Sequence, residues 1–283
     1  MTSGFAPACR IIVVGVDLGD AQVAALPLGH GDDPTSLLAM HGWQVLRVRD
    51  VVRHPADNQV LTVTFVVEPS LFQPRPVTEV TAGVHPGRGE DPASPAMVEV
   101  DRVFRHQRVA AYAVVTSSRG FLMTQFSDRT GAPGQWGLPG GGLDAEERPD
   151  HAVVREVWEE SGQLIEVGEL ALVASSRWVG HAPNGRLEDY HAVRVVYRAL
   201  CPEPTEPVVH DVGGTTESAA WFLPADLDLL ALTSGWRSIL RDVAGPGASV
   251  PRVSDSVMAP DETEGPDHHH HHTEADDRAR PQP

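Results

Sequence analysis

The apolar and polar positions of the chain form two structured regions, with a stretch rich in proline and glycine between them. In the first region, Ile11–Val16 is a short β-branched run typical of a buried strand. Asp33-Pro34, followed by Gly42, has the N-cap residue, the first-position proline and the terminating glycine of a short helix. Val45–Val52 and Val60–Val67 are strand-like runs joined by a polar turn, which predicts a hairpin. This region therefore predicts a small β-α-β-β unit.

The composition predicts four segments along the chain. Residues 1–69 form the small α+β unit, in which no group of residues carries recognisable chemistry. Residues 70–103 contain five prolines and several glycines, which is linker composition and indicates that the first unit packs as a separate body. Residues 104–245 return to dense strand and helix patterns. Residues 246–283 are polar and acidic with the histidine run His268–His272, and we expect this tail to be disordered.

Charge and cysteine content restrict the classes of function. The 283 residues carry a formal net charge of −17, and every basic residue apart from histidine is an arginine. Such acidity disfavours nucleic acid as a partner, although it permits a small phosphorylated ligand at one local site. No apolar run approaches the ~20 residues that span a bilayer. With only two cysteines and no recognisable secretory signal, we expect a cytoplasmic protein without a membrane partner, and a homodimer stays open.

The chemistry is concentrated in Trp136–Leu164, where a proline and three glycines precede a predicted helix from about Pro149 to Gly162. On that helix Glu156, Glu159 and Glu160 stand at i, i+3 and i+4 and share one face, which we expect to be open to solvent. Like charges at this spacing repel one another, and a hard cation such as Mg²⁺ turns the repulsion into attraction. Taken alone, the cluster fits an ordinary solvated acidic face better than a metal site.

The full spacing decides between these interpretations. Gly141, Glu147 and the segment Arg155–Gln163 follow the pattern G-x5-E-x7-R-E-U-x-E-E-x-G-U, in which U is apolar. Only Gln163 departs from it, at a packing position with Leu164 beside it. The chain resembles the Nudix hydrolase family in this motif.

The resemblance implies an α/β/α sandwich with a mixed sheet over about residues 105–245, in which the motif forms a loop–helix–loop. It leaves residues 1–103 unassigned. The strands that it implies are Arg108–Thr116, Gly120–Phe126, Gln163–Trp178, Glu188–Leu200 and a final strand around Glu217–Trp221.

The resemblance also implies an activity, the Mg²⁺-dependent hydrolysis of the pyrophosphate bond in a nucleoside diphosphate linked to another group, with Mn²⁺ as a substitute metal. The substrate would be a small nucleotide or another diphosphate. By correspondence with the motif, the implied metal ligands are Glu156, Glu159 and Glu160, together with Glu147 at the edge and the backbone carbonyl of Gly140 or Gly141. Arg155 would orient the neighbouring glutamates. A catalytically idle module that senses a nucleotide, with an N-terminal partner-binding domain, is the alternative.

Two assignments stay open at this level. The general base is either Glu156 or a carboxylate beyond the motif, for which Glu217 is the first candidate and Asp189 and Glu188 are weaker ones. The sequence does not identify the nucleotide. The residues considered for substrate contact are Arg177, Arg186, Arg194, Trp178, Tyr190, His181 and His191.

Overall fold

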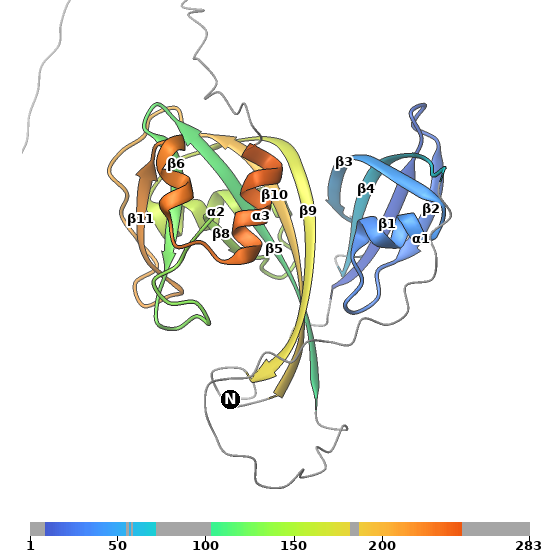
Figure 1. Ribbon diagram of the computed structural model, residues 1–283, viewed down its shortest axis with the longest axis horizontal. Coiled ribbons are helices and arrows are strands. Elements are labelled where there is room, and N and C mark those ends of the chain that lie inside the picture. Colours follow the sequence, from blue (N-terminus) through green and yellow to red (C-terminus); the bar gives the residue numbers. More distant parts are fainter. Residues whose placement is uncertain (1–8, 55–56, 58, 72–102, 182–186, 245–283) are drawn as a thin grey trace, which may run out of the picture. The chain divides into compact units, whose positions relative to one another are not determined.

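A computed structural model describes residues 9–54, 57, 59–71, 103–181 and 187–244, in two sheets (Figure 1). The tail with His268–His272 lies outside the described residues, so its predicted disorder stays a prediction. The first sheet and its helix are formed by β1 (Arg10–Val16), β2 (Gln22–Pro27), α1 (Pro34–Met40), β3 (Trp43–Arg53) and β4 (Val60–Pro69).

The first sheet has the strand order β2-β1-β4-β3, in which β1 and β4 are parallel and the other pairs antiparallel. The predicted hairpin is confirmed as β3 and β4. The predicted helix is also confirmed, because the Asp33 side chain accepts a hydrogen bond from the Ser36 N–H and Pro34 opens α1. The predicted order β-α-β-β was incomplete, since it lacked β2. The segment QVAALP carries two alanines, which have weak strand propensity, and pairing with β1 makes it a strand.

The second sheet is mixed, with the order β11-β6-β5-β10-β9, while β7 pairs with β6 and β8 pairs with β5. β5 and β10 are parallel, and the other pairs are antiparallel. Its strands are β5 (Phe104–Ser117), β6 (Gly120–Phe126), β7 (Trp136–Gly137), β8 (Gly140–Gly142), β9 (Glu166–His181), β10 (Leu187–Leu200) and β11 (Thr216–Phe222). α2 (Pro149–Ser161) lies between β8 and β9, and η2 (Pro224–Leu229) and α3 (Ser234–Ala244) follow β11.

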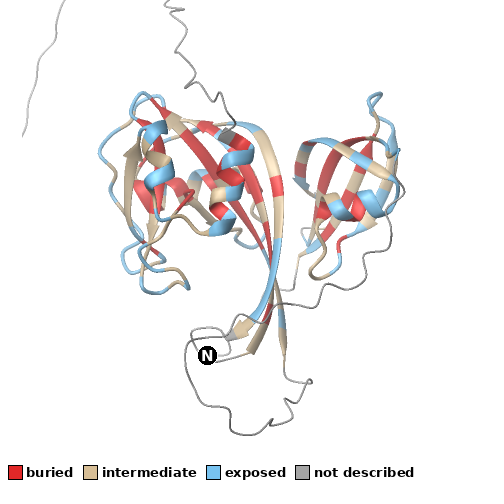
Figure 2. Ribbon diagram, viewed as in Figure 1, coloured by how far each residue is buried: buried red, intermediate tan, exposed pale blue. Residues whose placement is uncertain are grey.

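Two helices cover opposite faces of the second sheet, which confirms the predicted sandwich (Figure 1). Ala152, Val153 and Val157 of α2 belong to the same buried cluster as the odd-numbered positions of β5 from 109 to 115. Trp236 of α3 belongs to a second cluster that contains Val114, one position out of phase on β5. Figure 2 shows buried positions along the strands of both sheets and exposed positions on the outward sides of the helices.

The N-terminal sheet, formed by β1 to β4, also contacts the second sheet. Buried residues of both sheets form one hydrophobic cluster, in which Val51 and Val173 both take part. The Ser175 hydroxyl donates to the backbone carbonyl of Asp32 at 2.9 Å. The linker composition predicted that the N-terminal unit packs as a separate body, and these contacts do not agree with that expectation. The boundaries of the four segments stay predictions. Among the described residues, no helix has the length and apolar character needed to cross a membrane.

Candidate metal and catalytic site

The site begins at β8, whose three glycines run along β5 next to α2. Gly140 has a φ of 141°, which favours glycine, and a Cβ there would come within 2.3 Å of the Ala111 carbonyl oxygen. At Gly141 a Cβ would stand 2.5 Å from the carboxylate atoms of Glu156. The glycines therefore allow the backbone of β8 to approach both β5 and a carboxylate of α2.

The predicted helix is confirmed as α2, which runs from Pro149 to Ser161. Pro149 opens it, Asp150 adds negative charge at its positive end, and Gly162 ends it in the left-handed conformation. Ala152, Val153 and Val157 form its buried apolar side, and Glu156 and Glu160 lie next to these residues on the helix.

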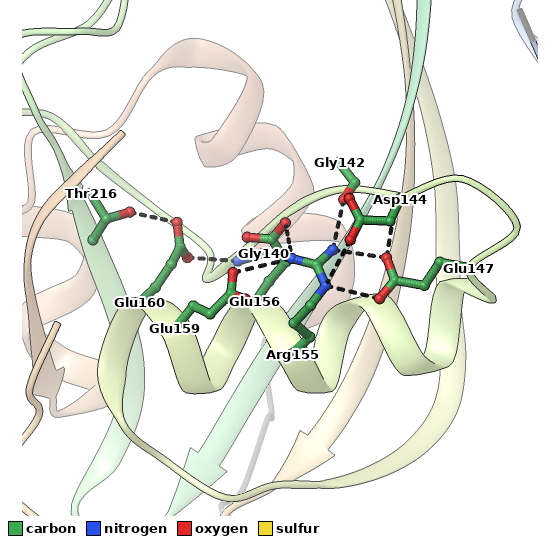
Figure 3. A network of polar contacts seen from close by, with 9 residues as sticks. All are labelled: Gly140, Gly142, Asp144, Glu147, Arg155, Glu156, Glu159, Glu160 and Thr216. Carbon is green, nitrogen blue, oxygen red and sulfur yellow. Dashed lines mark hydrogen bonds and ion pairs between the residues drawn. The ribbon is translucent and has the colours of Figure 1, made fainter. Parts of the chain in front are cut away.

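Arg155 is the centre of the polar network, and all five of its N–H groups have acceptors (Figure 3). Nε and Nη2 donate to the two carboxylate oxygens of Glu147 at 2.9 and 2.8 Å. Nη1 donates to Glu156 Oε1 at 3.0 Å and to Glu159 Oε2 at 3.1 Å. The second N–H of Nη2 donates to the Gly142 carbonyl at 3.0 Å. One guanidinium thus donates to three carboxylates and to the glycine-rich turn, and the orienting role of Arg155 in catalysis stays a prediction.

The environments of these carboxylates differ. The hydrogen bonds from Arg155 hold the pKa of Glu147 below its usual value. Burial raises the pKa of Glu156, although Arg155 opposes the rise. A carboxylate with a raised pKa is a stronger base than a free glutamate. The assignment of Glu156 as the general base stays a prediction.

Glu160 differs from expectation, because its side chain is not open to solvent but only 7% exposed. The Gly140 N–H donates to Glu160 Oε2 at 2.9 Å, and the Thr216 hydroxyl donates to Oε1 at 2.5 Å. Burial raises the pKa of Glu160 to about 8. The expectation failed because β11, which supplies Thr216, covers this end of α2 and lies far along the chain. Figure 3 shows Glu160 turned toward Thr216 and away from the Arg155 network.

The loop before β11 closes over the end of α2, and sequence reasoning did not identify this contact. The backbone N–H groups of His210 and Asp211 donate to the Glu159 carbonyl at 2.7 and 3.0 Å. The His210 ring stacks on Trp158, with ring centroids 4.5 Å apart. These bonds satisfy a carbonyl in the last turn of the helix. A loop has no hydrophobic periodicity, so the sequence alone does not predict that it contacts α2.

Glu217, the second candidate for the base, is exposed. It is the extra residue where the register of β11 against β6 shifts, between Thr216 and Ser218. It lines a pocket of about 410 Å³ together with Asp211 and Thr216. Among the described contacts, none joins Glu217 to the glutamates of α2.

The residue types at the site fit a hard divalent cation, because the donors are carboxylate and backbone oxygens with no sulfur. Three carboxylates, those of Glu147, Glu156 and Glu159, accept hydrogen bonds from Arg155, whereas the Glu160 carboxylate is bound by Gly140 and Thr216. Within the described ranges, no group of three acidic, histidine or cysteine side chains is arranged to hold a metal ion. The donor set therefore suits the cation, and the ligand assignment stays a proposal.

Several other residues considered at the sequence level lie elsewhere. Arg177 forms a two-pronged ion pair with the buried Asp189, at 2.6 and 2.8 Å, which holds the pKa of Asp189 at about 2. Such a carboxylate is a poor proton acceptor at neutral pH. His191 is buried and is hydrogen-bonded to Ser175 and Gln107. The described contacts of Arg177, Asp189 and His191 do not include the glutamates of α2. Arg186 and the side chain of His181 lie outside the described residues.

The fold and the site together define a hydrolase of the Nudix class. A family profile described as the NUDIX domain matches residues 106–243, so the chain belongs to the Nudix hydrolase family. The nucleoside triphosphatase NudI of Escherichia coli is 28% identical over 139 residues, which are 48% of this chain and 95% of that protein. NudI of Shigella flexneri gives the same values.

Among solved structures, the chain is similar to a MutT NUDIX hydrolase from Burkholderia pseudomallei, with 33% sequence identity and a TM-score of 0.38. The match covers 49% of this chain and 98% of the Burkholderia protein.

Proposed function

We propose that this protein hydrolyses the pyrophosphate bond of a small nucleoside diphosphate derivative, with Mg²⁺ or Mn²⁺ as the metal. The single observation that supports this most strongly is the Arg155 network, in which one fully hydrogen-bonded guanidinium arranges the acidic residues of the Nudix motif. Three carboxylates gathered at one guanidinium leave excess negative charge, which a bound divalent cation would neutralise.

The residues that would hold the metal are Glu156, Glu159, Glu160 and Glu147, with a backbone carbonyl of Gly141. When bound, a divalent cation would neutralise the negative charge of the pyrophosphate. Arg155 takes only one oxygen each from Glu156 and Glu159 among the described contacts, so the second oxygen of each can serve a ligand.

Proton transfer is assigned to Glu156 in this proposal. The attacking water must lose a proton, and Glu156 is a partly buried carboxylate with a raised pKa, held in place by Arg155. Glu217 remains the competing candidate, because it lines a pocket that reaches Thr216, the partner of Glu160. The contact with Arg155 favours Glu156, since it fixes the position of the proton acceptor.

Two arginines favour phosphate binding beside the glycine-rich turn. The guanidinium of Arg108 lies against Gly142, where an added Cβ would come within 2.4 Å of its Nη2. Arg194 of β10 donates from Nη1 to the Ser176 hydroxyl at 2.7 Å. Guanidinium groups present planar donors that match phosphate oxygens, so the substrate phosphates would extend over this face of the sheet.

An aromatic row on the same face is suited to a nucleobase. Tyr190 stands directly opposite His106 on one side and Trp178 on the other, with ring centroids 5.3 and 5.6 Å away. Trp178 is 44% exposed. Tyr190 and Arg194 are four residues apart on β10 and so share a face about 13 Å apart, roughly the reach of a nucleotide. The base would stack on this row while the phosphates meet the arginines.

We also place the protein in the cytoplasm and expect small nucleotides, not nucleic acids, as its ligands. The formal net charge of −17 repels a polyanionic backbone but leaves room for a single phosphorylated molecule at the arginines.

The test is a screen of nucleoside triphosphates, nucleotide sugars and dinucleoside polyphosphates with Mg²⁺ or Mn²⁺, with chromatography of the nucleotide products. We expect a nucleoside monophosphate from at least one class, and loss of that product in Glu156→Gln. The matched control is Glu166→Gln, which removes one exposed acidic charge outside the network. Nucleotide binding without any product in the wild-type protein would instead support the idle sensing module.

A further inference from the structure

Arg53, the last residue of β3, reaches the Nudix motif from the N-terminal sheet. Its Nε donates to the backbone carbonyl of Glu147 at 2.8 Å, although the two residues are 94 positions apart. Arg53 is half-buried. The side-chain carboxylate of Glu147 also accepts two hydrogen bonds from Arg155.

The loop that receives this hydrogen bond contains one strained residue next to its local hydrogen bonds. Glu146 has a φ of 64°, a left-handed conformation that costs a non-glycine residue of order 1 kcal/mol. Arg148 stands at the N-cap of α2 but makes no side-chain capping bond. The loop does have the bond from the Asp144 N–H to Glu147 Oε2, at 2.9 Å. Arg53 therefore adds a hydrogen-bond donor from the N-terminal sheet to a loop that contains a strained residue.

Other contacts also join the N-terminal sheet to the second sheet. The Gln107 side chain donates to the Cys9 carbonyl at 3.2 Å, and His30 Nε2 lies 3.1 Å from Asp189 Oδ1. Arg53 itself lies close enough to Cys9 to oppose the rise in the thiol's pKa that burial causes. The first two contacts join Cys9 to β5 and His30 to β10, so Arg53 is one of several links between the two sheets.

A continuous series of contacts leads from Arg53 to the acidic face of α2. Arg53 holds the Glu147 backbone, the Glu147 carboxylate holds Arg155, and Arg155 holds Glu156 and Glu159. We propose that Arg53 is a positioning residue for the Nudix site, and that residues 9–69 belong to the catalytic unit. This inference rests on the proposed function for its effect on turnover, but not for its effect on the loop.

The experiment compares Arg53→Ala with Arg49→Ala in the full-length chain. Arg49 lies on the same strand and is paired with Asp20 of the N-terminal sheet, so its loss removes the same charge without touching the motif. Amide hydrogen exchange of residues 144–148 and Mn²⁺ affinity by electron paramagnetic resonance are measured for both variants. For Arg53→Ala we expect exchange about tenfold faster and Mn²⁺ affinity about tenfold weaker, as for one lost charge-assisted hydrogen bond.

Two further variants separate positioning from general stability. Arg53→Lys keeps a donor and the charge, so it should recover part of the Mn²⁺ affinity and also serves if Arg53→Ala fails to fold. In a Glu147→Gln background, Arg53→Ala should weaken Mn²⁺ affinity far less than in the wild type, because the route through Glu147 is already broken. An additive loss in the double variant would show that Arg53 acts elsewhere.

Exchange and affinity within twofold of Arg49→Ala would overturn the inference. If the wild-type protein hydrolyses nucleotides and Arg53→Ala has the same turnover, exchange and Mn²⁺ affinity as the wild type, the inference fails and the proposed function stands. If the wild type hydrolyses none of the nucleotides, the proposed function fails, and the exchange and Mn²⁺ measurements still decide the role of Arg53.

Discussion

Glu160→Gln should make the metal-free protein more stable in mildly alkaline solution while reducing its turnover. Burial raises the pKa of Glu160 to about 8, against 4.5 for an unperturbed glutamate. Between these values the folded protein keeps a proton that the unfolded chain releases, so the free energy of unfolding falls as the pH rises. Each pKa unit corresponds to about 1.4 kcal/mol, so this one group can remove up to about 5 kcal/mol across that interval.

The glutamine amide is neutral at every pH and resembles the protonated acid in shape. The variant should therefore match the wild type near pH 5 and exceed its stability by a few kcal/mol near pH 8.5. The assay is urea unfolding from pH 5 to 9 with a chelator present, because bound metal would compete with the proton. Glu166→Gln, at an exposed position, is the control and should follow the wild type throughout.

A difference between Glu160→Gln and the wild type that stays the same at every pH would refute this reasoning, since the buried carboxylate would then not titrate in the interval. Turnover supplies the second half of the prediction. The substitution removes a proposed metal ligand, so activity at limiting Mg²⁺ should fall at least tenfold even where stability rises.

Three other predictions concern the base, the interior ion pair and the substrate face. Glu156→Gln should reduce both turnover and Mn²⁺ affinity, whereas Glu217→Gln should leave both close to the wild-type values; a severe loss of turnover in Glu217→Gln with unchanged Mn²⁺ affinity would assign the base to Glu217. Asp189→Asn should lower the free energy of unfolding by about 2 kcal/mol at pH 7, because Arg177 loses its charged partner. That difference should shrink as the pH falls through about 4 toward 2, where Asp189 in the wild type takes up its proton, and urea titrations check both statements. Trp178→Ala should raise KM about tenfold with little change in kcat, and equal losses in both would argue against base stacking in the ground state.

The sequence by itself determined the features that depend on neighbouring residues. The helix α2 begins at Pro149 and ends at Gly162 as predicted, because capping and helix termination act within one turn. The common face of Glu156, Glu159 and Glu160 follows from 3.6 residues per turn, and the spacing of the Nudix motif indicated the class of enzyme. The strand that sequence reading missed, β2, has weak propensity of its own and exists through its pairing with β1.

The tertiary structure decided how far each residue of the motif is buried and which groups it contacts. Glu160 looks like its neighbours in the sequence, yet it is buried because Thr216, 56 residues away, covers it. The sequence did not indicate a role for Arg53, because it donates to the backbone carbonyl of Glu147. Every residue has a backbone carbonyl, so such a contact cannot be predicted from residue types. Local periodicity sets which residues share a face, whereas burial and hydrogen-bond partners depend on segments that only folding brings together.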